Sequence, residues 1–329
     1  MVAYARRRNA AHVNAAAKRK RTPLRTRAMR FAWGERTYLM GIVNVTPDSF
    51  SGDGRPETPQ ALAHAQALHA AGADILDLGA ESTRPGAREI DADEECRRLL
   101  PVARAVREAL PEAVLSVDTY KPTVLAAAHA AGCDWLNSVW GFGPSDSAAE
   151  RRESDDSPAE RRESDDALLA FAAERRLPVV AMHNKRVAVY DGDVVDEVLR
   201  YLDAHAARAV RAGVPPEAVI LDPGIGFGKT ADHNLAVLAA LDRVVALGFP
   251  TLVGTSRKST LGRLTGRAVD ERAYATAATV ALAVAAKIDI VRVHDVAAMR
   301  DAARVADAVV RGWRPPAWNA QPTPTRRDG

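Results

Sequence analysis

The feature that most constrains this chain is an alternation of short apolar runs with longer amphipathic stretches, which repeats eight times. Each apolar run has the length of a β-strand, and each Ala-rich stretch after it has the length and periodicity of a helix. The predicted strands are Tyr38–Val43, Asp74–Leu78, Val114–Val117, Trp135–Asn137, Pro178–Met182, Val219–Leu221, Thr251–Val253 and Ile288–Val293. The predicted helices cover 58–71, 91–109, 121–131, 167–176, 194–212, 232–247, 269–286 and 295–311.

Eight successive βα units predict an α/β fold whose strands close into a (β/α)8 TIM barrel. A doubly wound open sheet is the alternative, but crossovers of one hand make eight uninterrupted units close more naturally than splay. The chain has 329 residues, more than the roughly 250 that such a barrel takes. We therefore expect a single barrel domain over residues 36–312.

The two ends of the chain differ from this pattern. Residues 1–30 carry ten Lys or Arg and no acid, so that the remainder stands at about −7 although the net charge is +3. We expect a solvated, disordered basic extension over 1–35, and the alternatives are a nucleic-acid-binding arm or a transit peptide. Because Met29 is a second plausible start, removal of the residues before it should leave activity intact. The Pro-rich segment 313–329 should also be disordered.

A tandem repeat interrupts the alternation after the fourth strand. The ten residues from Ser147 to Asp156 recur at 157–166 with one change. Two copies of this length are too short for a solenoid, which needs several longer repeats. We expect the insert at 147–166 to extend the loop and the helix after that strand, and a lid over the site is the alternative.

Several classes of protein are excluded by composition. No apolar run approaches the roughly 18 residues that span a bilayer, and the N-terminus lacks the apolar core of a secretory signal, so we expect a soluble, cytoplasmic protein without membrane partners. Two cysteines, Cys96 and Cys133, make neither a disulfide framework nor a cysteine-rich metal site, and both are expected to be packing residues.

Polar residues follow every predicted strand, at the end where barrels of this kind carry their chemistry. Asp118, Asn137, Asp222 and Lys258 should project into the barrel mouth. Carboxylate, amide and ammonium groups together suit a flat heterocycle with donors and acceptors on its edge. Asp222 could take two parallel hydrogen bonds from an amino-pyrimidinone edge. Each residue alone has an ordinary explanation as a helix cap or a surface ion pair, but the four together favour a site.

A second, cationic group consists of Arg84, Arg292 and His294, beside the loops where barrels commonly hold phosphate. We expect a polyanion there. No His/Cys spacing for zinc is present, so any metal should be Mg²⁺, which bridges phosphate oxygens and takes few protein ligands. Asn44 is the candidate protein contact for that ion.

The glycine-rich run from Gly224 to Thr230 superficially resembles a nucleotide-binding loop. A phosphate loop would need glycine where Pro223 stands, and a dinucleotide fingerprint would need glycine where Lys229 stands. We interpret the run as a tight turn that brings Phe227 over the site.

Six motifs occur in an order that resembles the dihydropteroate synthase family of pterin-binding enzymes, and the resemblance covers residues 36–312. They are MGIVNVTPDSFS, ESTRPGA, SVDTYKP, DPGIGFGKT, GTSRKS and RVHDV. The resemblance implies a dimeric barrel that holds the pterin with Asp118, Asn137, Asp222, Lys258 and Met182. It implies a diphosphate site of Arg84, Arg292, His294 and Asn44, with Asn44 near Mg²⁺. It also implies an aminobenzoate site, where sulfonamides compete, formed by Phe50, Thr83, Pro85, Phe227 and Ser259.

The reaction implied by the resemblance joins 7,8-dihydropterin-6-ylmethyl diphosphate to 4-aminobenzoate in folate biosynthesis. Lys258, Arg292, His294 and Arg84 would be the catalytic residues, and no nucleic-acid partner is expected. The alternatives are a non-catalytic pterin-binding paralogue and a pterin-dependent methyltransferase domain, which should lack ESTRPGA, SRKS and RVHDV. Two positions depart from the family pattern: Ser138 replaces an Asp, and Ala80 replaces a Gly.

Overall fold

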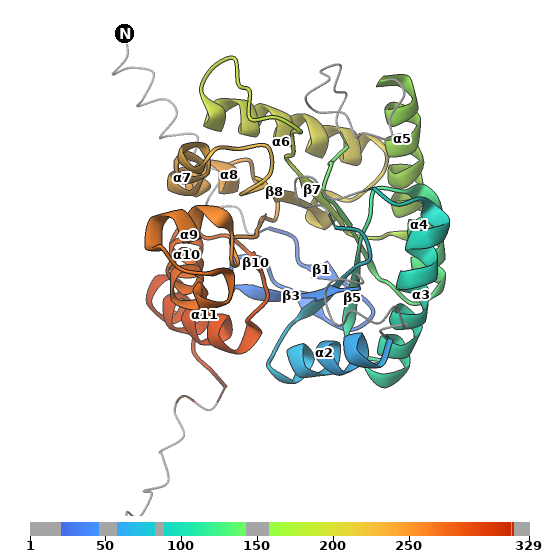
Figure 1. Cartoon of the computed structure of the whole chain (residues 1–329), viewed down its shortest axis with the longest axis horizontal. Helices are drawn as coiled ribbons and strands as arrows, with labels where there is room; N and C mark the ends of the chain where they lie inside the picture. The colour runs from blue at the N-terminus through green and yellow to red at the C-terminus, as the bar shows by residue number, and fades with distance from the viewer. Residues whose placement is uncertain (1–20, 46–57, 83–88, 143–157, 317, 319–329) are drawn as a thin grey trace, which may run out of the picture.

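The computed structural model describes residues 21–45, 58–82, 89–142, 158–316 and 318, and its centre is a ring of parallel strands (Figure 1). The strands are β3 (Tyr38–Asn44), β4 (Ile75–Gly79), β5 (Val114–Asp118), β6 (Trp135–Ser138), β7 (Val179–Met182), β8 (Val219–Asp222), β9 (Leu252–Val253) and β10 (Ile290–Val293). Their side chains are almost all buried because helices cover the outside of the ring and neighbouring strands fill the inside.

The eight strands form one sheet in the order β8-β7-β6-β5-β4-β3-β10-β9. Its two edges meet at a narrow seam. There a single parallel bridge joins Leu221 to Thr251, and the Leu221 amide donates to the Pro250 carbonyl at 2.9 Å. The predicted (β/α)8 barrel is therefore confirmed, and the open-sheet alternative does not apply.

Helices surround the barrel, and several bounds differ from those predicted. They are α2 (Thr58–Ala70), α3 (Ala92–Ala109), α4 (Pro122–Ala130), α5 (Pro158–Arg175), α6 (Val194–Arg211), α7 (Ala231–Ala239), α8 (Leu241–Val245), α9 (Ser259–Thr265), α10 (Ala273–Ala285) and α11 (Val296–Val310). The helix expected over 232–247 is interrupted at Ala240, where φ is −116°, and α9 was not predicted. The described part of the second repeat copy belongs to α5, which starts nine residues before the predicted helix at 167.

The prediction of a disordered extension through residue 35 is wrong for residues 21–35. This segment forms the two-stranded sheet β1 (Leu24–Arg25) and β2 (Arg30–Phe31). Phe31 is fully buried, and its ring centroid lies 5.1 Å from that of Trp135 on β6. Apolar side chains among the basic residues thus cover the amino-terminal end of the barrel, opposite the strand ends that carry the predicted site.

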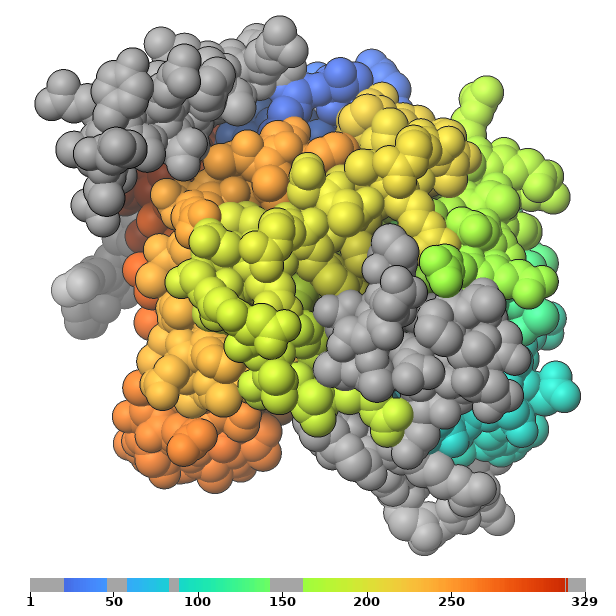
Figure 2. Space-filling model, turned by 90° about the horizontal axis from the view of Figure 1, so that it is seen from above, coloured from blue at the N-terminus to red at the C-terminus, as the bar shows by residue number. Residues whose placement is uncertain are grey.

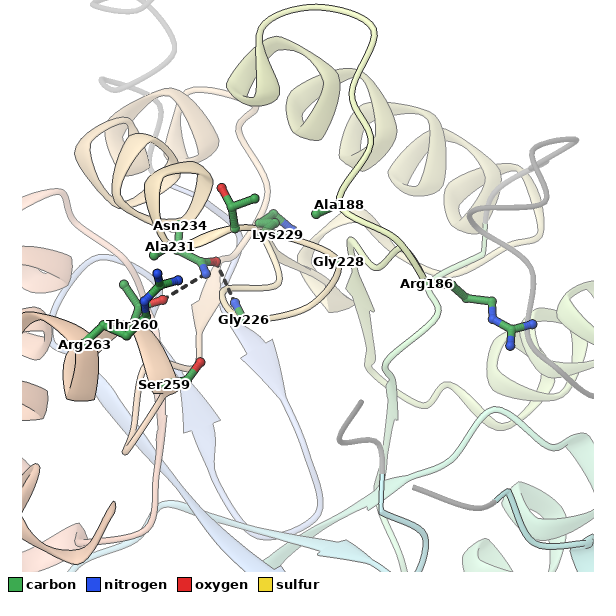
Figure 3. A pocket seen from close by; sticks show the side chains of 11 residues that line it. Arg186, Ala188, Gly226, Gly228, Lys229, Ala231, Asn234, Ser259, Thr260 and Arg263 are labelled. Carbon is green, nitrogen blue, oxygen red and sulfur yellow. Dashed lines mark hydrogen bonds between the residues drawn. The ribbon is translucent and has the colours of Figure 1, made fainter. Parts of the chain in front are cut away.

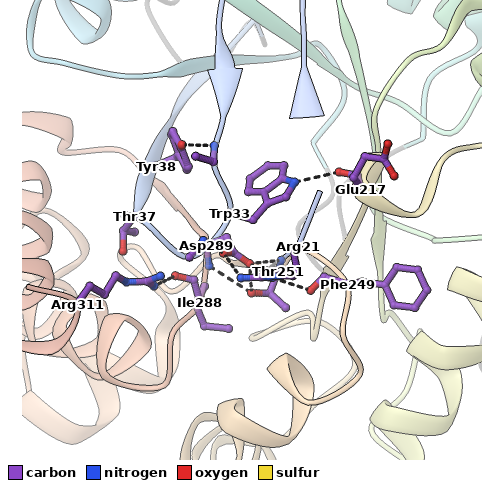
Figure 4. Close-up of polar contacts among 12 residues, drawn as sticks. Arg21, Trp33, Thr37, Tyr38, Glu217, Phe249, Thr251, Ile288, Asp289 and Arg311 are labelled. Carbon is purple, nitrogen blue, oxygen red and sulfur yellow. Dashed lines mark hydrogen bonds and ion pairs between the residues drawn. The ribbon is translucent and has the colours of Figure 1, made fainter. Parts of the chain in front are cut away.

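Polar contacts fasten the same segment to the barrel (Figure 4). Two Arg21 nitrogens donate to the two oxygens of the fully buried Asp289 carboxylate, each at 2.6 Å. The Thr251 amide donates to the same carboxylate at 2.9 Å, and the Trp33 indole donates to the Glu217 carbonyl at 3.1 Å. In the space-filling view the blue N-terminal residues lie against yellow and orange residues of the later units (Figure 2). The first described residues therefore connect to strands near the seam.

Some predictions fall outside the described residues. They concern residues 1–20 of the extension, the first repeat copy within 143–157, and positions 317 and 319–329 of the tail. Over the ranges that the structure describes, no helix combines the length and the apolar character needed to cross a bilayer.

Candidate active site

Five of the predicted site residues lie at one end of the barrel because each stands at the carboxyl end of a parallel strand. Asp118 on β5 is in register with Asn137 on β6, and Met182 on β7 is in register with Asp222 on β8. Lys258 follows β9 by five residues, where it precedes α9. The structure therefore brings the predicted heterocycle-binding residues to a common mouth.

A buried ionic network occupies the floor of this mouth. The Arg292 guanidinium donates from Nε to Asp77 Oδ2 at 2.7 Å and from Nη2 to Asp118 Oδ2 at 3.1 Å. Asn137 Nδ2 donates to the same Asp77 oxygen at 2.9 Å. Asp77 is fully buried, and its other oxygen has no hydrogen-bond partner among the described residues. A buried acceptor of this kind is costly unless a donor reaches it, so the floor is suited to a ligand that carries N–H groups.

Arg292 was predicted in a separate cationic group, but its guanidinium lies between two carboxylates of the heterocycle group. Burial opposes its charge, yet Asp77 and Asp118 outweigh that effect and raise the pKa of Arg292. Burial raises the pKa of Asp118, and the nearby Arg292 charge only partly offsets it while Asp77 adds to it. The guanidinium has five N–H donors, of which these bonds use two. The two predicted groups thus share one residue.

Asp222 and Lys258 form the other side of the mouth. The Gly224 amide donates to Asp222 Oδ1 at 2.8 Å. Burial raises the pKa of Asp222 to about 6, although the Gly224 amide and the Lys258 charge favour the ionised form. The carboxylate is therefore mainly ionised at neutral pH, as an acceptor for the fork of an amino-pyrimidinone requires.

Phe227 lies over the site, as the interpretation of the glycine-rich run predicted. The Lys258 Nζ stands 4.0 Å above the centroid of its ring. Phe227 also packs against a small apolar cluster of Tyr120, Val139 and Met182. Gly226 has φ of +82°, which L side chains rarely adopt, so glycine is needed at this turn, and a Cβ there would also displace the Lys258 side chain, whose Cδ lies 2.9 Å away.

His294 lies next to this network but is a neutral ring rather than a cation. Its Nδ1 lies 3.0 Å from the Ser256 hydroxyl oxygen, and its backbone amide donates to the same oxygen at 3.1 Å. Burial lowers the pKa of His294 to about 4, and the charges of Arg292 and Arg257 add to this effect. The sequence analysis grouped His294 with the cations. The ring would carry a positive charge only if a bound polyanion stabilised its protonated form.

The loop that carries Lys258 and Ser259 is held in a strained shape by Arg257. This residue has φ of +58°, in the left-handed region that non-glycine residues seldom adopt. Its Nε and Nη2 donate to the two Asp295 oxygens at 3.0 and 2.5 Å. The ion pair ties the loop after β9 to the residue that follows His294, so the two loops keep one relative position.

Four predicted residues lie outside the described residues: Phe50, Thr83, Arg84 and Pro85. Glu81, which lies two residues before the second of those segments, is well held. Glu81 accepts a hydrogen bond from the Tyr120 hydroxyl at 2.8 Å and pairs with the Lys121 ammonium, which also bonds Glu95 at 2.6 Å. Glu81 is thus tied to the loop after β5 and, through Lys121, to α3.

Ser259 lines a cavity of about 290 Å³ beside the mouth (Figure 3). The cavity also contacts Gly226, Thr230 and Arg263. Asn234 also lines it and links two parts of its wall, because its Oδ1 accepts the Gly226 amide at 2.7 Å and its Nδ2 donates to the Thr260 hydroxyl at 3.0 Å. Ser259 therefore lies on the Phe227 side of the site, apart from the ionic floor.

A metal site was predicted with Asn44 as its protein contact. Asn44 ends β3, in register with Gly79 on β4, and is partly buried. The described ranges contain no group of three or more His, Cys, Asp or Glu residues able to hold an ion. Asn44 offers one amide oxygen, a kind of ligand that a hard cation such as Mg²⁺ takes together with oxygens of a substrate.

Sequence reasoning missed Asp77, Ser256 and Glu81 as parts of the site. Asp77 had a signal that could have found it, since it is an acid in the middle of an otherwise apolar strand. Ser256 and Glu81 follow predicted strands, but their partners come from other βα units. Those contacts depend on the barrel's closure and leave no local pattern.

The fold and the strand-end groups define a barrel enzyme that binds a nitrogen heterocycle, and comparison with known proteins specifies it. The family model of pterin binding enzymes matches residues 40–294. A dihydropteroate synthase of Synechocystis is 39% identical over 295 residues, which are 86% of this chain and 93% of that protein. The chain belongs to the dihydropteroate synthase family of pterin-binding enzymes.

Two solved structures agree with this assignment. A Clostridium difficile dihydropteroate synthase, solved in the presence of pteroic acid, is 38% identical with a TM-score of 0.76 and covers 85% of this chain and 99% of its own. A Xanthomonas albilineans dihydropteroate synthase with 4-aminobenzoic acid is 41% identical with a TM-score of 0.73 and covers 84% of this chain and 94% of its own.

Proposed function

We propose the roles by which this member of the dihydropteroate synthases makes 7,8-dihydropteroate and diphosphate in folate biosynthesis. The observation that carries the proposal is the set of carboxylate, amide and ammonium groups of Asp118, Asn137, Asp222 and Lys258, buried or partly buried at one end of the barrel. Asp222 accepts the two N–H groups of the pterin's amino-pyrimidinone edge. Asn137 and Asp118 bind the remaining edge, and Met182 packs against the ring face.

The chemistry that follows is loss of diphosphate from the pterin CH₂ carbon. The C–O bond breaks with its electron pair on the diphosphate, and the electron-rich dihydropterin ring stabilises the cation that remains. Arg292 and Arg84 bind the leaving group, and His294 hydrogen-bonds to it. The amine nitrogen of 4-aminobenzoate then attacks the carbon and releases a proton. Phe227 and Ser259, with Phe50, Thr83 and Pro85, hold that second substrate, and sulfonamides compete for this place.

Asn44 is the residue that would hold Mg²⁺, since its amide oxygen is a kind of ligand that such an ion takes. When bound, the ion would neutralise charge on the diphosphate oxygens. Removal of divalent cations by a chelator should therefore reduce turnover, and added Mg²⁺ should restore it. Turnover that is unaffected by chelation would remove Mg²⁺ from the proposal.

The test of the activity is release of diphosphate by the purified chain with both substrates, repeated without the aromatic amine. Product should form only when both are present. Loss of one preorganised charge partner typically costs on the order of 10²–10³ in rate. Arg292→Ala and Lys258→Ala should therefore each lower kcat/KM by about that factor while the fold survives. Near-normal turnover of both variants would refute these assignments, and pterin binding without turnover by the intact chain would favour a non-catalytic paralogue.

We also propose a homodimer formed through α10 and α11, which lie side by side on the outside of the barrel (Figure 1). Exposed apolar side chains gather there, including Leu282 and Val305, and Val309 is 80% exposed. An apolar groove lined by Ala302, Val305 and Val309 runs along these helices. Exposed patches of this kind on soluble proteins commonly mark association surfaces. The expected cytoplasmic location stays a prediction.

Light scattering after size-exclusion chromatography tests this interface. The intact chain should have twice the mass of one copy, and Val309→Glu should shift it to the monomer. Leu264→Glu is the matched control, because Leu264 is 61% exposed but lies on α9. A monomeric intact chain, or a Val309→Glu dimer, would contradict the proposal.

A further inference from the structure

A partly buried lysine that the reaction does not use lies beside the site. Lys229 is the last residue of the loop that begins at Gly224. Its Nζ lies 2.7 Å from His183 Nδ1, 3.0 Å from the Gly224 carbonyl and 3.2 Å from the Phe227 carbonyl. An ammonium group has three N–H donors, and here three acceptors face it.

The contacts of Lys229 link two different strand ends. His183 follows β7 and is fully buried, and its amide donates to the Asp222 carbonyl at 2.9 Å. Burial and the Lys229 charge lower the pKa of His183 well below its usual value, so Nδ1 is available as an acceptor. Lys229 thus joins the loop after β8 to the end of β7 at the point where the loop turns back.

The bond to the Phe227 carbonyl places Lys229 next to the aromatic ring over the site. The ring itself faces the Lys258 Nζ, which lies 4.0 Å from its centroid. The Phe227 amide closes the turn on the Gly224 carbonyl at 3.2 Å, which is the second carbonyl that Lys229 contacts. Both carbonyls that define the turn are therefore bound by one ammonium group.

The glycines of the loop show how closely it lies on its neighbours. At Gly224 a Cβ would come within 1.9 Å of the His183 carbonyl oxygen, and at Gly228 within 2.3 Å of the Lys185 carbonyl oxygen. The Tyr190 hydroxyl donates to the Gly228 carbonyl at 2.8 Å. The loop thus depends on polar attachments at its carbonyls, of which Lys229 supplies two.

We propose that Lys229 is a positioning residue for the second substrate: it fastens the Gly224–Lys229 loop to His183 and so holds the Phe227 ring where the aromatic amine binds. The inference rests on the proposed function. It separates Lys229 from the floor carboxylates Asp77 and Asp118, which belong to β4 and β5 and take their bonds from Arg292.

The decisive experiment compares Lys229→Met with the intact chain. Methionine keeps much of the length and apolar contact but provides no donor. The substitution removes all three Lys229 hydrogen bonds together, and a loss of two or three such bonds typically changes binding by about 10- to 100-fold. We expect KM for 4-aminobenzoate to rise by about that factor at saturating pterin diphosphate. The dissociation constant of the pterin, followed by its fluorescence, should change less than threefold, about the scatter of near-neutral substitutions.

The matched control is Lys287→Met, since Lys287 is exposed and precedes β10 at the opposite end of the barrel. It should leave both constants unchanged. A Lys229→Met protein whose amine KM equals that of the intact chain overturns the inference, as does an equal loss of pterin and amine binding. If the intact chain makes no product, the proposed function itself fails, and the two failures are thereby told apart.

A second variant covers the case in which Lys229→Met does not fold. Lys229→Gln keeps two N–H donors for the loop carbonyls but is too short to reach His183 as well. It should fold and show the same selective rise in amine KM, to a smaller extent. If this variant is also unfolded, Lys229 is a folding residue and the positioning role is rejected.

Discussion

The side chains of the site show how a neighbour decides what a residue can do. Asp222 and Asp118 were both predicted from their places at strand ends, and both are there. Their protonation was not predictable, because it follows from burial and from the charges of other strands. His294 illustrates this most directly: as a strand-end histidine between Arg292 and Asp295 it suggested a cation, whereas burial among cations keeps it neutral.

The raised pKa of Asp222 predicts that pterin binding weakens in mild acid. Asp222 is ionised above its pKa of about 6 and protonated below it. Protonation removes an acceptor from the bidentate contact, so affinity should fall by up to about tenfold per pH unit below that value. Fluorescence titration between pH 7.5 and pH 5 measures this, with a pterin that lacks the diphosphate so that phosphate ionisation does not contribute.

Asp222→Asn provides the control for that titration. The variant should bind the pterin weakly at every pH and lose the step near pH 6. An unchanged step in Asp222→Asn would assign the titration to another group and contradict the explanation.

At the scale of elements, the alternation of strands and helices was readable from the sequence, but the joints between them were not. The single helix expected over 232–247 divides at Ala240, and α9 occupies a stretch that carried no helical period. One loop was predictable where the helix boundaries were not, because the glycine-rich run was correctly interpreted as a tight turn that carries Phe227. Its chemistry was incomplete, since the role of Lys229 requires His183 from a separate unit.

Two glycines with the same backbone angle provide a prediction about the loop over the site. Gly224 has φ of +66° and Gly266 has φ of +70°, so alanine is strained at both by roughly 1–2 kcal/mol. At Gly266 no atom lies within 4 Å of a Cβ, whereas at Gly224 the His183 carbonyl oxygen would lie 1.9 Å away. Gly224→Ala should therefore lower the free energy of unfolding by roughly 1–3 kcal/mol more than Gly266→Ala.

Urea denaturation of the two variants measures this difference, and the amine KM of Gly224→Ala should also rise because Phe227 shifts. Equal unfolding free energies would mean that the loop is free to move away from β7.

At the scale of the whole molecule, the closed barrel was predicted and the cover over its amino-terminal end was not. The basic composition of the first residues concealed Leu24, Phe31 and Trp33, which are buried under the strands. Periodicity could not reveal them, because β1 and β2 have two residues each. The two ends of the barrel thus have separate tasks, since one carries the chemistry and the other is sealed.

A chain beginning at Met29 is expected to keep its activity, but this arrangement predicts that it is less stable. Arg21 makes two 2.6 Å bonds to the buried Asp289 carboxylate, and their loss should lower the free energy of unfolding by about 2–3 kcal/mol. We expect Arg21→Met to be less stable in urea denaturation, and the shortened chain less stable still because it also lacks buried Leu24. In both proteins kcat/KM should stay unchanged below the unfolding transition.

Arg25→Met is the control, because Arg25 is exposed on β1. If it destabilises the protein as much as Arg21→Met does, the buried carboxylate is not the reason. A fall in kcat/KM of the folded Arg21→Met protein would show that the two ends of the barrel are coupled.

The narrow seam between β8 and β9 has a consequence for how substrate affects the fold. One bridge closes the ring there. Asp222 ends β8 on one side of the seam, and Lys258 follows β9 on the other side. A pterin that binds both side chains therefore spans the barrel's weakest joint. Pterin binding should therefore slow hydrogen–deuterium exchange at Leu221 and Thr251, because the bound ligand stabilises the closed seam between β8 and β9.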